Sequence, residues 1–199
     1  EDGIWGSNTS TLPITQLAEG ASKPDNFIGI HFFSPVDKMP LVEIICGEKT
    51  SDIALAKAYD YTKQIRKTPI VVNDSLGFFT SRTFGTYFDE GVRAVTEGVH
   101  PIKVDNLGKA IGMPVGPLTV HDETSLELSR KAMETWEEMG VKGKYGEQNA
   151  LEEMIAFMIG ENNRGGRHHG GGYFEYHEDG SKTIWPGLVD KFYRPEVEI

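Results

Sequence analysis

The sequence predicts an α/β domain over residues 1–74, followed by an all-α domain over residues 75–199. In the first part, short apolar runs bounded by turn residues alternate with helical patterns, which is typical of a sheet covered by helices. In the second part, apolar residues recur every three or four positions, and glycine or proline ends each segment. The turn-rich junction at residues 73–77 marks the expected boundary between the two.

Three apolar runs predict the strands of the first domain: Phe27–Phe33, Leu41–Ile45 and Thr68–Val72. Residues 12–19 predict a short helix, because Pro13 suits a first helical turn and Gly20 suits a helix end. A second helix is expected after the capping residues Thr50–Asp52, where apolar positions recur at helical spacing. The order strand, strand, helix, strand suits the closing part of an α/β sheet domain.

Four helices are expected in the second domain, over residues 84–99, 101–111, 128–139 and 151–159. Ser81 falls three residues before Phe84, so it shares the predicted buried stripe of the first of these helices. In the second helix, Leu107 and Ile111 are assigned to the inward face. Residues 113–119 predict a loop, because proline and glycine are frequent there.

Composition and charge disfavour several classes of protein. The 199 residues carry a formal net charge of −10 and contain no basic run, which disfavours a nucleic-acid partner. No run approaches the roughly 18 apolar residues that a membrane span needs. Cys46 is the single cysteine, so an internal disulfide is impossible, and the sequence suits a reducing compartment.

Two polar residues stand inside the apolar runs, His31 in the first and Glu43 in the second. If these runs form neighbouring strands, the two side chains come close together. A carboxylate bonded to one imidazole nitrogen fixes the tautomer and makes the other nitrogen a general base. The pair therefore predicts either acid–base chemistry or a structural ion pair in the core, and the pattern alone leaves both open.

Four blocks of sequence resemble the 3-hydroxyacyl-CoA dehydrogenase family, and most of all its multifunctional β-oxidation α-subunits. They are SNTSTLPIT at 7–15, HFFSPVDKMPLVEII from His31 onward, GFFTSR at 77–82 and GMPVGPLTVHDE at 112–123. The resemblance implies that residues 1–74 form the closing part of a doubly wound, Rossmann-like NAD-binding domain. It also implies that residues 75–199 form a helical bundle domain, which closes over the acyl chain and mediates dimerisation.

The resemblance further implies NAD-dependent oxidation of an (S)-3-hydroxyacyl-CoA to the 3-oxoacyl-CoA in fatty-acid β-oxidation. His31 is then the general base, and Glu43 orients it and stabilises the imidazolium that forms. The expected partners are the 3-hydroxyacyl-CoA substrate and either a second copy of the chain or a larger β-oxidation complex, with no nucleic acid and no membrane span. The expected compartment is the bacterial cytoplasm or the mitochondrial matrix.

Further site residues follow from the same resemblance. Ser10 is expected to contact both substrate and NAD, with Asn8 and Ser34 beside the cofactor, although all three also suit a turn or a helix cap. Ser81 stands where monofunctional members carry Asn, which helps to hold the substrate carbonyl, and serine lacks the amide fork. The alternative for Ser81 is a serine bonded back to a helix carbonyl.

Two weaker candidates lie in or beside the glycine-rich segment 163–176. The basic cluster Arg164, Arg167, His168 and His169 suits either the phosphates of a nucleotide or CoA, or a mobile, solvated loop. A metal site formed by His168, His169 and His177 matches no familiar ligand spacing, so no metal is expected.

The sequence contains no G-x-G-x-x-G motif, the loop that binds pyrophosphate in dinucleotide-binding folds. The chain therefore looks like a C-terminal portion of such an enzyme. The 199 residues alone are expected to bind little NAD and to show no turnover. The alternatives are a non-catalytic assembly module and a related dehydrogenase that acts on another hydroxyacyl substrate.

Overall fold

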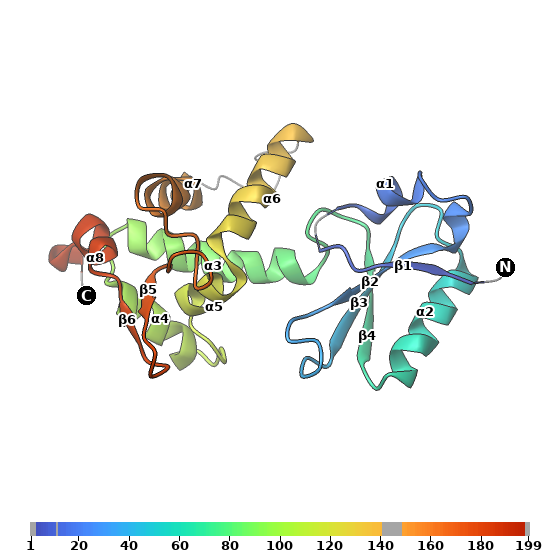
Figure 1. Cartoon of the computed structure of the whole chain (residues 1–199), viewed down its shortest axis with the longest axis horizontal. Coiled ribbons are helices and arrows are strands. Elements are labelled where there is room, and N and C mark those ends of the chain that lie inside the picture. The colour runs from blue at the N-terminus through green and yellow to red at the C-terminus, as the bar shows by residue number, and fades with distance from the viewer. Residues whose placement is uncertain (1–2, 11, 141–148, 198–199) are drawn as a thin grey trace. The chain divides into compact units, whose positions relative to one another are not determined.

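The computed structural model describes residues 3–10, 12–140 and 149–197. The chain divides into two compact units, Glu1–Phe84 (unit 1) and Gly85–Ile199 (unit 2). Unit 1 is built on a sheet and unit 2 is mainly helical (Figure 1), in agreement with the fold class predicted from the sequence. In the described part of the chain, no helix is both long and apolar enough to cross a membrane.

Unit 1 contains a four-stranded sheet with the order β1-β2-β3-β4. The strands are β1 (Trp5–Ser7), β2 (Phe27–Phe32), β3 (Leu41–Cys46) and β4 (Thr68–Asn73), and a 3-10 turn at Pro24–Asn26 leads into β2. β1 and β2 are parallel, β2 and β3 are antiparallel, and β3 and β4 are parallel. The C-terminal ends of β1 and β2 therefore lie at the same end of the sheet as the N-terminal ends of β3 and β4.

Each face of this sheet is covered by a different helix. On one face, α2 (Asp52–Gln64) packs through a buried aliphatic cluster, Ile28, Ile30, Val42, Ile44 and Ala58. On the other face, Ile45 packs with Phe78 and with Ile14 of α1 (Ile14–Ala18). Because side chains alternate along a strand, His31 and Glu43 lie on the same face as Ile45.

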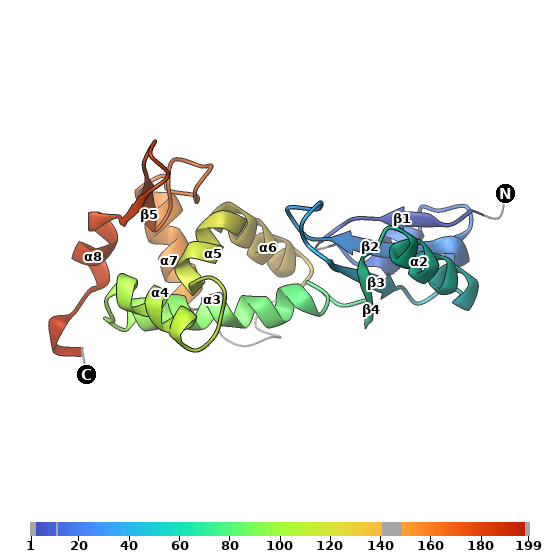
Figure 2. The ribbon, with the colours of Figure 1, turned by 90° about the horizontal axis from the view of Figure 1, so that it is seen from below.

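Unit 2 consists of helices and one small hairpin. In chain order its elements are α3 (Thr80–Thr96), α4 (Pro101–Ala110), α5 (Pro117–Thr124), α6 (Leu126–Glu138), α7 (Asn149–Ile155) with a π-helical turn (Ala156–Glu161), β5 (Phe174–Tyr176), β6 (Lys182–Ile184), α8 (Pro186–Phe192) and a 3-10 turn (Pro195–Val197). β5 and β6 are antiparallel. The long helix α3, whose course is seen in Figure 2, begins in unit 1 and ends in unit 2.

Most of these elements contribute side chains to one buried core. It includes Val92 and Val95 of α3, Val104 of α4, Leu118 of α5, Leu126 of α6, Met154 of α7, Phe174 of β5 and Leu188 of α8. Local sequence explains where several helices begin. α4, α5 and α8 each start with proline. Proline suits the first helical position because an N–H at that position has no partner within the helix, so its absence costs nothing.

Two sequence predictions for unit 2 are wrong in detail. The loop expected over 113–119 is shorter, because Pro117 already begins α5. On α4, the exposed fractions of Leu107 and Ile111 are 52% and 77%, so neither side chain faces inward. Gly108 faces inward instead, and a Cβ added there would lie 2.7 Å from Pro117 Cδ. The close approach of the two helices at this glycine turns the Leu107 side of α4 outward.

Candidate functional site

His31 and Glu43 face each other across β2 and β3. The antiparallel register pairs the two residues directly, and His31 Nδ1 lies 2.8 Å from Glu43 Oε2. Glu43 is completely buried, and His31 keeps an exposed fraction of 7%. The apolar residues on either side of His31 and Glu43 form β2 and β3. The pairing of these two strands then places the two polar side chains opposite each other.

The second carboxylate oxygen of Glu43 is bound by the backbone at the start of α3. Glu43 Oε1 accepts hydrogen bonds from the N–H groups of Phe79, at 3.1 Å, and Thr80, at 2.8 Å. Burial by itself raises the pKa of Glu43, but hydrogen bonds from His31 and from the Thr80 backbone outweigh burial and lower the pKa below its ordinary value. The carboxylate is therefore ionised at neutral pH although it is buried.

This hydrogen bond determines which nitrogen of His31 is available for chemistry. An ionised carboxylate only accepts hydrogen bonds, so Nδ1 carries a proton and Nε2 has a lone pair. The imidazole centroid lies 4.6 Å from the Phe33 ring centroid and 5.9 Å from that of Phe78. With this arrangement, Nε2 can take a proton from a bound hydroxyl while Glu43 stabilises the imidazolium that results.

The connection between β4 and α3 is fixed on both sides of Phe78. Phe78 is completely buried and has a φ of 47°, in the left-handed region that non-glycine residues rarely adopt. Upstream, the two carboxylate oxygens of Asp74 accept the N–H groups of Ile14, at 2.8 Å, and Thr15, at 2.7 Å, at the start of α1. Sequence analysis missed these contacts because they join positions 59 or 60 residues apart.

Asn8, Ser10 and Ser34 follow the C-terminal ends of β1 and β2. The side-chain oxygen of Asn8 accepts a hydrogen bond of 2.9 Å from the N–H of Phe32, which ties the two strand ends together. Ser10 is half-buried, and Asn8 and Ser34 are exposed. Open α/β sheets bind ligands at the carboxyl ends of their strands. The three residues therefore lie in the region where a ligand is expected, as does His31.

Ser81 does not lie on a buried stripe, contrary to the sequence prediction. The residue is exposed, and the buried residues of α3 are Gly91, Val92 and Val95. The stripe argument fails because the buried residues of α3 lie in the second half of the helix and not in its first turns. Ser81 nevertheless follows directly after Thr80, whose N–H binds Glu43.

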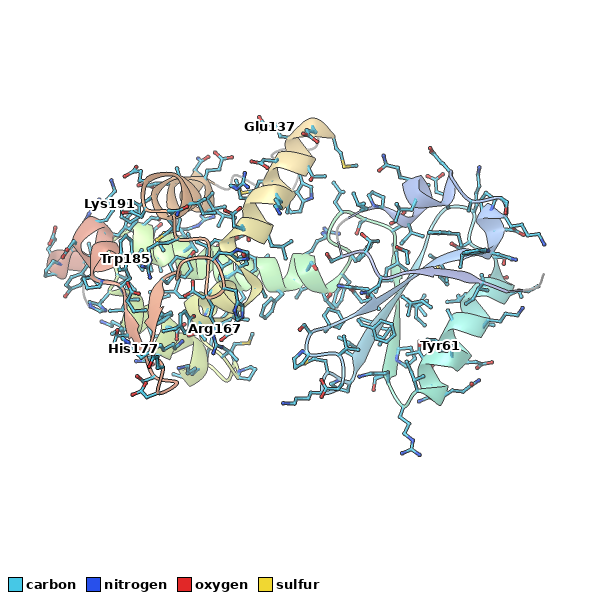
Figure 3. All side chains as sticks on the ribbon, in the orientation of Figure 1. Tyr61, Glu137, Arg167, His177, Trp185 and Lys191 are labelled. Atoms are coloured by element: carbon cyan, nitrogen blue, oxygen red, sulfur yellow. The ribbon has the colours of Figure 1, made fainter. Side chains whose placement is uncertain are left out.

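Arg164 of the basic cluster is buried. This contradicts the interpretation of the glycine-rich segment as a mobile, solvated loop. The buried guanidinium of Arg164 donates to three acceptors, the carbonyls of Gly172 and Phe174 and the carboxylate of Glu175. It lies 4.6 Å from the ring centroid of Trp185. Arg167, labelled with Trp185 in Figure 3, pairs with Glu123 at 2.6 Å. Arg164 is thus used inside the protein, where it fastens the β5–β6 hairpin that sequence analysis did not anticipate.

A buried histidine in unit 2 has no counterpart among the sequence predictions. His121 is completely buried, with Nε2 2.9 Å from Ser129 Oγ and Nδ1 3.0 Å from the Tyr173 hydroxyl. Its ring stacks on that of Phe88 at a centroid distance of 4.3 Å. Burial lowers the pKa of His121 to about 3, so the ring is neutral at neutral pH.

The neighbouring Asp122 connects α5 to the hairpin. Its carboxylate accepts the backbone N–H groups of Tyr173, at 2.8 Å, and Phe174, at 3.1 Å, and the Tyr176 hydroxyl at 2.9 Å. Burial raises the pKa of Asp122 to about 6, against the lowering effect of these bonds and of the Lys182 charge. The three donors belong to the chain itself, which indicates a structural role.

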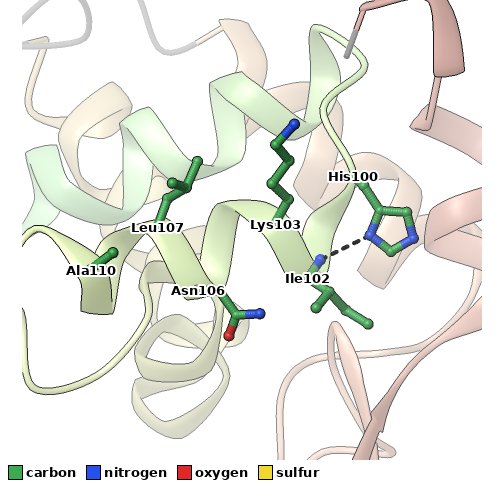
Figure 4. Close-up of a pocket in the computed structure, with 6 residues that line it drawn as sticks. All are labelled: His100, Ile102, Lys103, Asn106, Leu107 and Ala110. Atoms are coloured by element: carbon green, nitrogen blue, oxygen red, sulfur yellow. Dashed lines mark hydrogen bonds between the residues drawn. The ribbon is translucent and has the colours of Figure 1, made fainter. Parts of the chain in front are cut away.

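The outward side of α4 carries an open depression. It has a volume of about 510 Å³ and is lined by His100, Ile102, Lys103, Asn106, Leu107 and Ala110 (Figure 4). His100 Nδ1 caps the helix by accepting the N–H of Ile102 at 3.2 Å. The lining contains no carboxylate to activate this histidine, so the depression resembles a contact surface more than a reaction site.

Comparison with known proteins accounts for both parts of the chain. Residues 1–75 match the model described as 3-hydroxyacyl-CoA dehydrogenase, NAD binding domain, and residues 77–176 match that of the C-terminal domain. The fatty acid oxidation complex subunit alpha of Shewanella halifaxensis (strain HAW-EB4) is 42% identical over 180 residues, covering 88% of this chain and 24% of the relative. The same subunit of Shewanella sp. (strain W3-18-1) is 39% identical over 186 residues, covering 92% and 25%. The chain therefore spans about a quarter of the length of these relatives.

Solved structures agree with this match. The (S)-3-hydroxybutyryl-CoA dehydrogenase PaaH1 from Ralstonia eutropha is 36% identical with a TM-score of 0.72, and the match covers 81% of this chain and 59% of that one. M. tuberculosis FadB2 is 27% identical with a TM-score of 0.76, and the match covers 87% and 60%. Two domain models in the right order, and relatives that share the fold over most of the chain, lead to one conclusion. The chain belongs to the 3-hydroxyacyl-CoA dehydrogenase family.

Proposed function

We propose that this protein oxidises an (S)-3-hydroxyacyl-CoA to the 3-oxoacyl-CoA with NAD, as a step of fatty-acid β-oxidation. One observation carries the proposal. A histidine and a buried, ionised glutamate are hydrogen-bonded near the C-terminal end of β2, in a chain that matches both domain models of the family. The reaction removes a proton from the 3-hydroxyl and a hydride from the carbon that bears it, which leaves a carbonyl.

His31 is the proposed general base. Its Nε2 takes the proton of the 3-hydroxyl, and Glu43 stabilises the imidazolium as the positive charge develops. Ser10 is proposed to hold the substrate oxygen by a hydrogen bond, with Ser81 as a second contact. NAD, when bound, accepts the hydride.

The residues of this chain suit one part of NAD. Asn8, Ser10 and Ser34 present amide and hydroxyl groups after the ends of β1 and β2, and we assign them to the nicotinamide half. The pyrophosphate needs the backbone donors of a glycine-rich loop, and residues 1–199 contain no G-x-G-x-x-G. A polypeptide of these residues alone should bind NAD more weakly than about 1 mM in a calorimetric titration. Micromolar binding would contradict this assignment.

Replacement of His31 by Gln tests the proposed reaction. In the natural-length protein, H31Q should lower kcat for 3-hydroxyacyl-CoA oxidation by about 10²- to 10⁴-fold, because proton removal belongs to the transition state. KM should stay within about 3-fold of wild type. H177Q is the matched control, since His177 is exposed and its ring bonds only Thr183 among the described contacts, within the β5–β6 hairpin. An effect confined to KM would show that His31 binds substrate and does not remove the proton.

We further propose that the outward side of α4 joins two copies of this chain. The relatives are named as subunits of a fatty acid oxidation complex. The side chains of Ile102, Leu107 and Ile111 are 43%, 52% and 77% exposed on or beside this one helix, and grouped apolar side chains of this kind mark a protein contact. L107D should shift the protein toward monomer in analytical ultracentrifugation. Unchanged sedimentation over the same concentrations would contradict the assignment.

A further inference from the structure

The Glu43 carboxylate is bound from two directions. Oε2 faces His31 on β2, and Oε1 faces the N–H groups of Phe79 and Thr80, where α3 begins. The adjacent strand β4 places Ile70 opposite Glu43. In the part of the chain that the structure describes, His31 is the titratable group that faces this carboxylate. One imidazole, two backbone donors and the Thr80 hydroxyl therefore stabilise the charge of Glu43.

We propose that the N–H groups of Phe79 and Thr80 are positioning groups for the general base, because they hold Glu43 in its charged form and keep Nε2 of His31 free of a proton. The inference rests on the proposed function. It gives the connection between β4 and α3 a role in the reaction, exerted through Glu43 and not by contact with the substrate.

The direction of the effect follows from the charges of the pair. The form that acts as a base, with neutral His31 and ionised Glu43, has one net negative charge, and its conjugate acid has none. Hydrogen-bond donors and the N-terminus of a helix both stabilise the more negative form. Loss of one donor should therefore favour the protonated pair, so that the base loses its function at a higher pH than in the wild type.

The two donors are held in place independently of the pair. Phe78, directly before them, is buried against Ile14 and Ile45 and keeps a φ of 47°, a conformation that persists only where packing enforces it. Asp74 anchors the other end of the connection by binding the start of α1. The donors need not move when charge develops on His31, which is the condition for electrostatic stabilisation by a pre-organised site.

Thr80→Pro removes one of the two donors with little disturbance of the helix. Thr80 is the first residue of α3, and α4, α5 and α8 already carry proline at that position. Thr80→Val is the matched variant, since it keeps the N–H and removes only the hydroxyl. The Thr80 hydroxyl also helps to lower the pKa of Glu43. Both variants lack this hydroxyl, so the difference between them reports on the N–H alone.

The measurement is the pH profile of kcat/KM in the natural-length protein. In T80P the acid limb should lie about half a pH unit above that of T80V, because the two variants lack the same hydroxyl and only T80V keeps the N–H. A fall by the same factor at every pH would overturn the inference, because a merely loosened structure gives that result. Loss of turnover in H31Q with an unshifted limb in T80P would contradict this inference alone. Unaffected turnover in H31Q would contradict the proposed function itself.

Amide NMR of the unmodified protein provides a second test, which does not depend on a variant that folds. The amide proton resonances of Phe79 and Thr80 should shift as pH falls through the titration of the pair, because the charge of their acceptor changes. The Glu97 amide, which donates to the Arg93 carbonyl at 2.9 Å near the other end of α3, should stay constant and is the internal control. Constant Phe79 and Thr80 resonances while the His31 ring titrates would overturn the inference.

Discussion

Each unit of the chain buries a histidine, and the two differ in what surrounds them. His31 in unit 1 is bonded to an ionised carboxylate at the end of a strand. His121 in unit 2 is bonded to the neutral hydroxyls of Ser129 and Tyr173, and burial lowers its pKa to about 3. Such a histidine is too weak a base to serve near neutral pH. Burial of an imidazole therefore indicates nothing about function until its partners are known.

The two buried carboxylates show the same contrast. Glu43 and Asp122 each accept two backbone N–H groups and one side-chain bond. Burial raises the pKa of Asp122 to about 6, whereas in Glu43 the bonds outweigh burial and lower the pKa. The side chains bonded to the two carboxylates differ: Glu43 is bonded to an imidazole and Asp122 to the Tyr176 hydroxyl, while the Lys182 charge acts on Asp122 without a hydrogen bond. Only the imidazole can both share a proton with its carboxylate and exchange one with a ligand.

The largest effect that separates the two sites is expected from Glu43→Gln. If the amide oxygen keeps the bonds from Phe79 and Thr80, the amide nitrogen donates to Nδ1 and forces the proton of His31 onto Nε2. kcat should fall by about 10³- to 10⁴-fold, because the base is then in the wrong tautomer. Steady-state kinetics and ¹⁵N NMR of the imidazole check the two parts. A kcat within about 10-fold of wild type would make Glu43 a structural partner, like Asp122.

The corresponding change in unit 2, His121→Gln, should act on stability and not on turnover. It removes the stacking on Phe88 and leaves the hydroxyls of Ser129 and Tyr173 with poorer partners. The free energy of unfolding should fall by about 2–4 kcal/mol, as measured by denaturant unfolding, while kcat per folded molecule stays the same. A loss of kcat without a loss of stability would place His121 in the catalytic machinery.

The same unit should show two pH effects of opposite sign. The fold favours neutral His121, so this contribution is complete above pH 6.5 and is lost as pH falls toward about 3. The fold favours protonated Asp122, so that contribution is complete below pH 3.8 and is lost as pH rises to about 6. Between pH 4 and 6 the two nearly cancel in the wild type.

Single variants should separate these two contributions. When pH is lowered from about 6.5 to about 4, H121Q should gain about 3 kcal/mol of unfolding free energy relative to wild type. D122N should lose a similar amount relative to wild type between about pH 6 and about 4. Denaturant unfolding at a series of pH values measures both differences. Parallel pH curves for wild type and both variants would contradict the account.

The smallest effect is expected from Ser81→Asn. Ser81 is exposed, so the free energy of unfolding should change by less than about 0.5 kcal/mol. If Ser81 contacts the substrate oxygen as proposed, the longer amide should raise kcat/KM by about 2- to 10-fold, since it adds a donor at that oxygen. Unchanged kinetics at unchanged stability would remove Ser81 from the site.

Sequence alone was more informative about unit 1 than about unit 2. Apolar runs with one polar residue each are local signals, and they predicted both the central strands and the facing of His31 and Glu43. The stripe that contains Ser81 and the stripe that contains Leu107 misled for one physical reason. Periodicity shows which residues share a face of a helix, but other elements decide which face is covered. On α4, the close approach of Gly108 to Pro117 determines which face is covered.

Two further features had no usable signal in the sequence. The donors to Glu43 are main-chain groups, and every residue except proline carries an N–H. The partners of Asp122 lie 51 to 54 positions away along the chain. Neither composition nor spacing identifies such contacts, because only the folded chain brings the groups together.

The way in which α3 begins has a consequence for how this family can exchange its parts. The two family models meet at residue 76, yet the groups that bind Glu43 lie at residues 79 and 80, inside the second model. A recombination at this junction would therefore replace part of the support of the His31–Glu43 pair along with the helical domain. Main-chain donors survive almost any change of side chain, but they do not survive a change in the number of residues after β4. Side-chain changes that keep Asp74 and Phe78 in place would therefore leave the donors where they are, whereas an insertion or deletion after β4 would displace them.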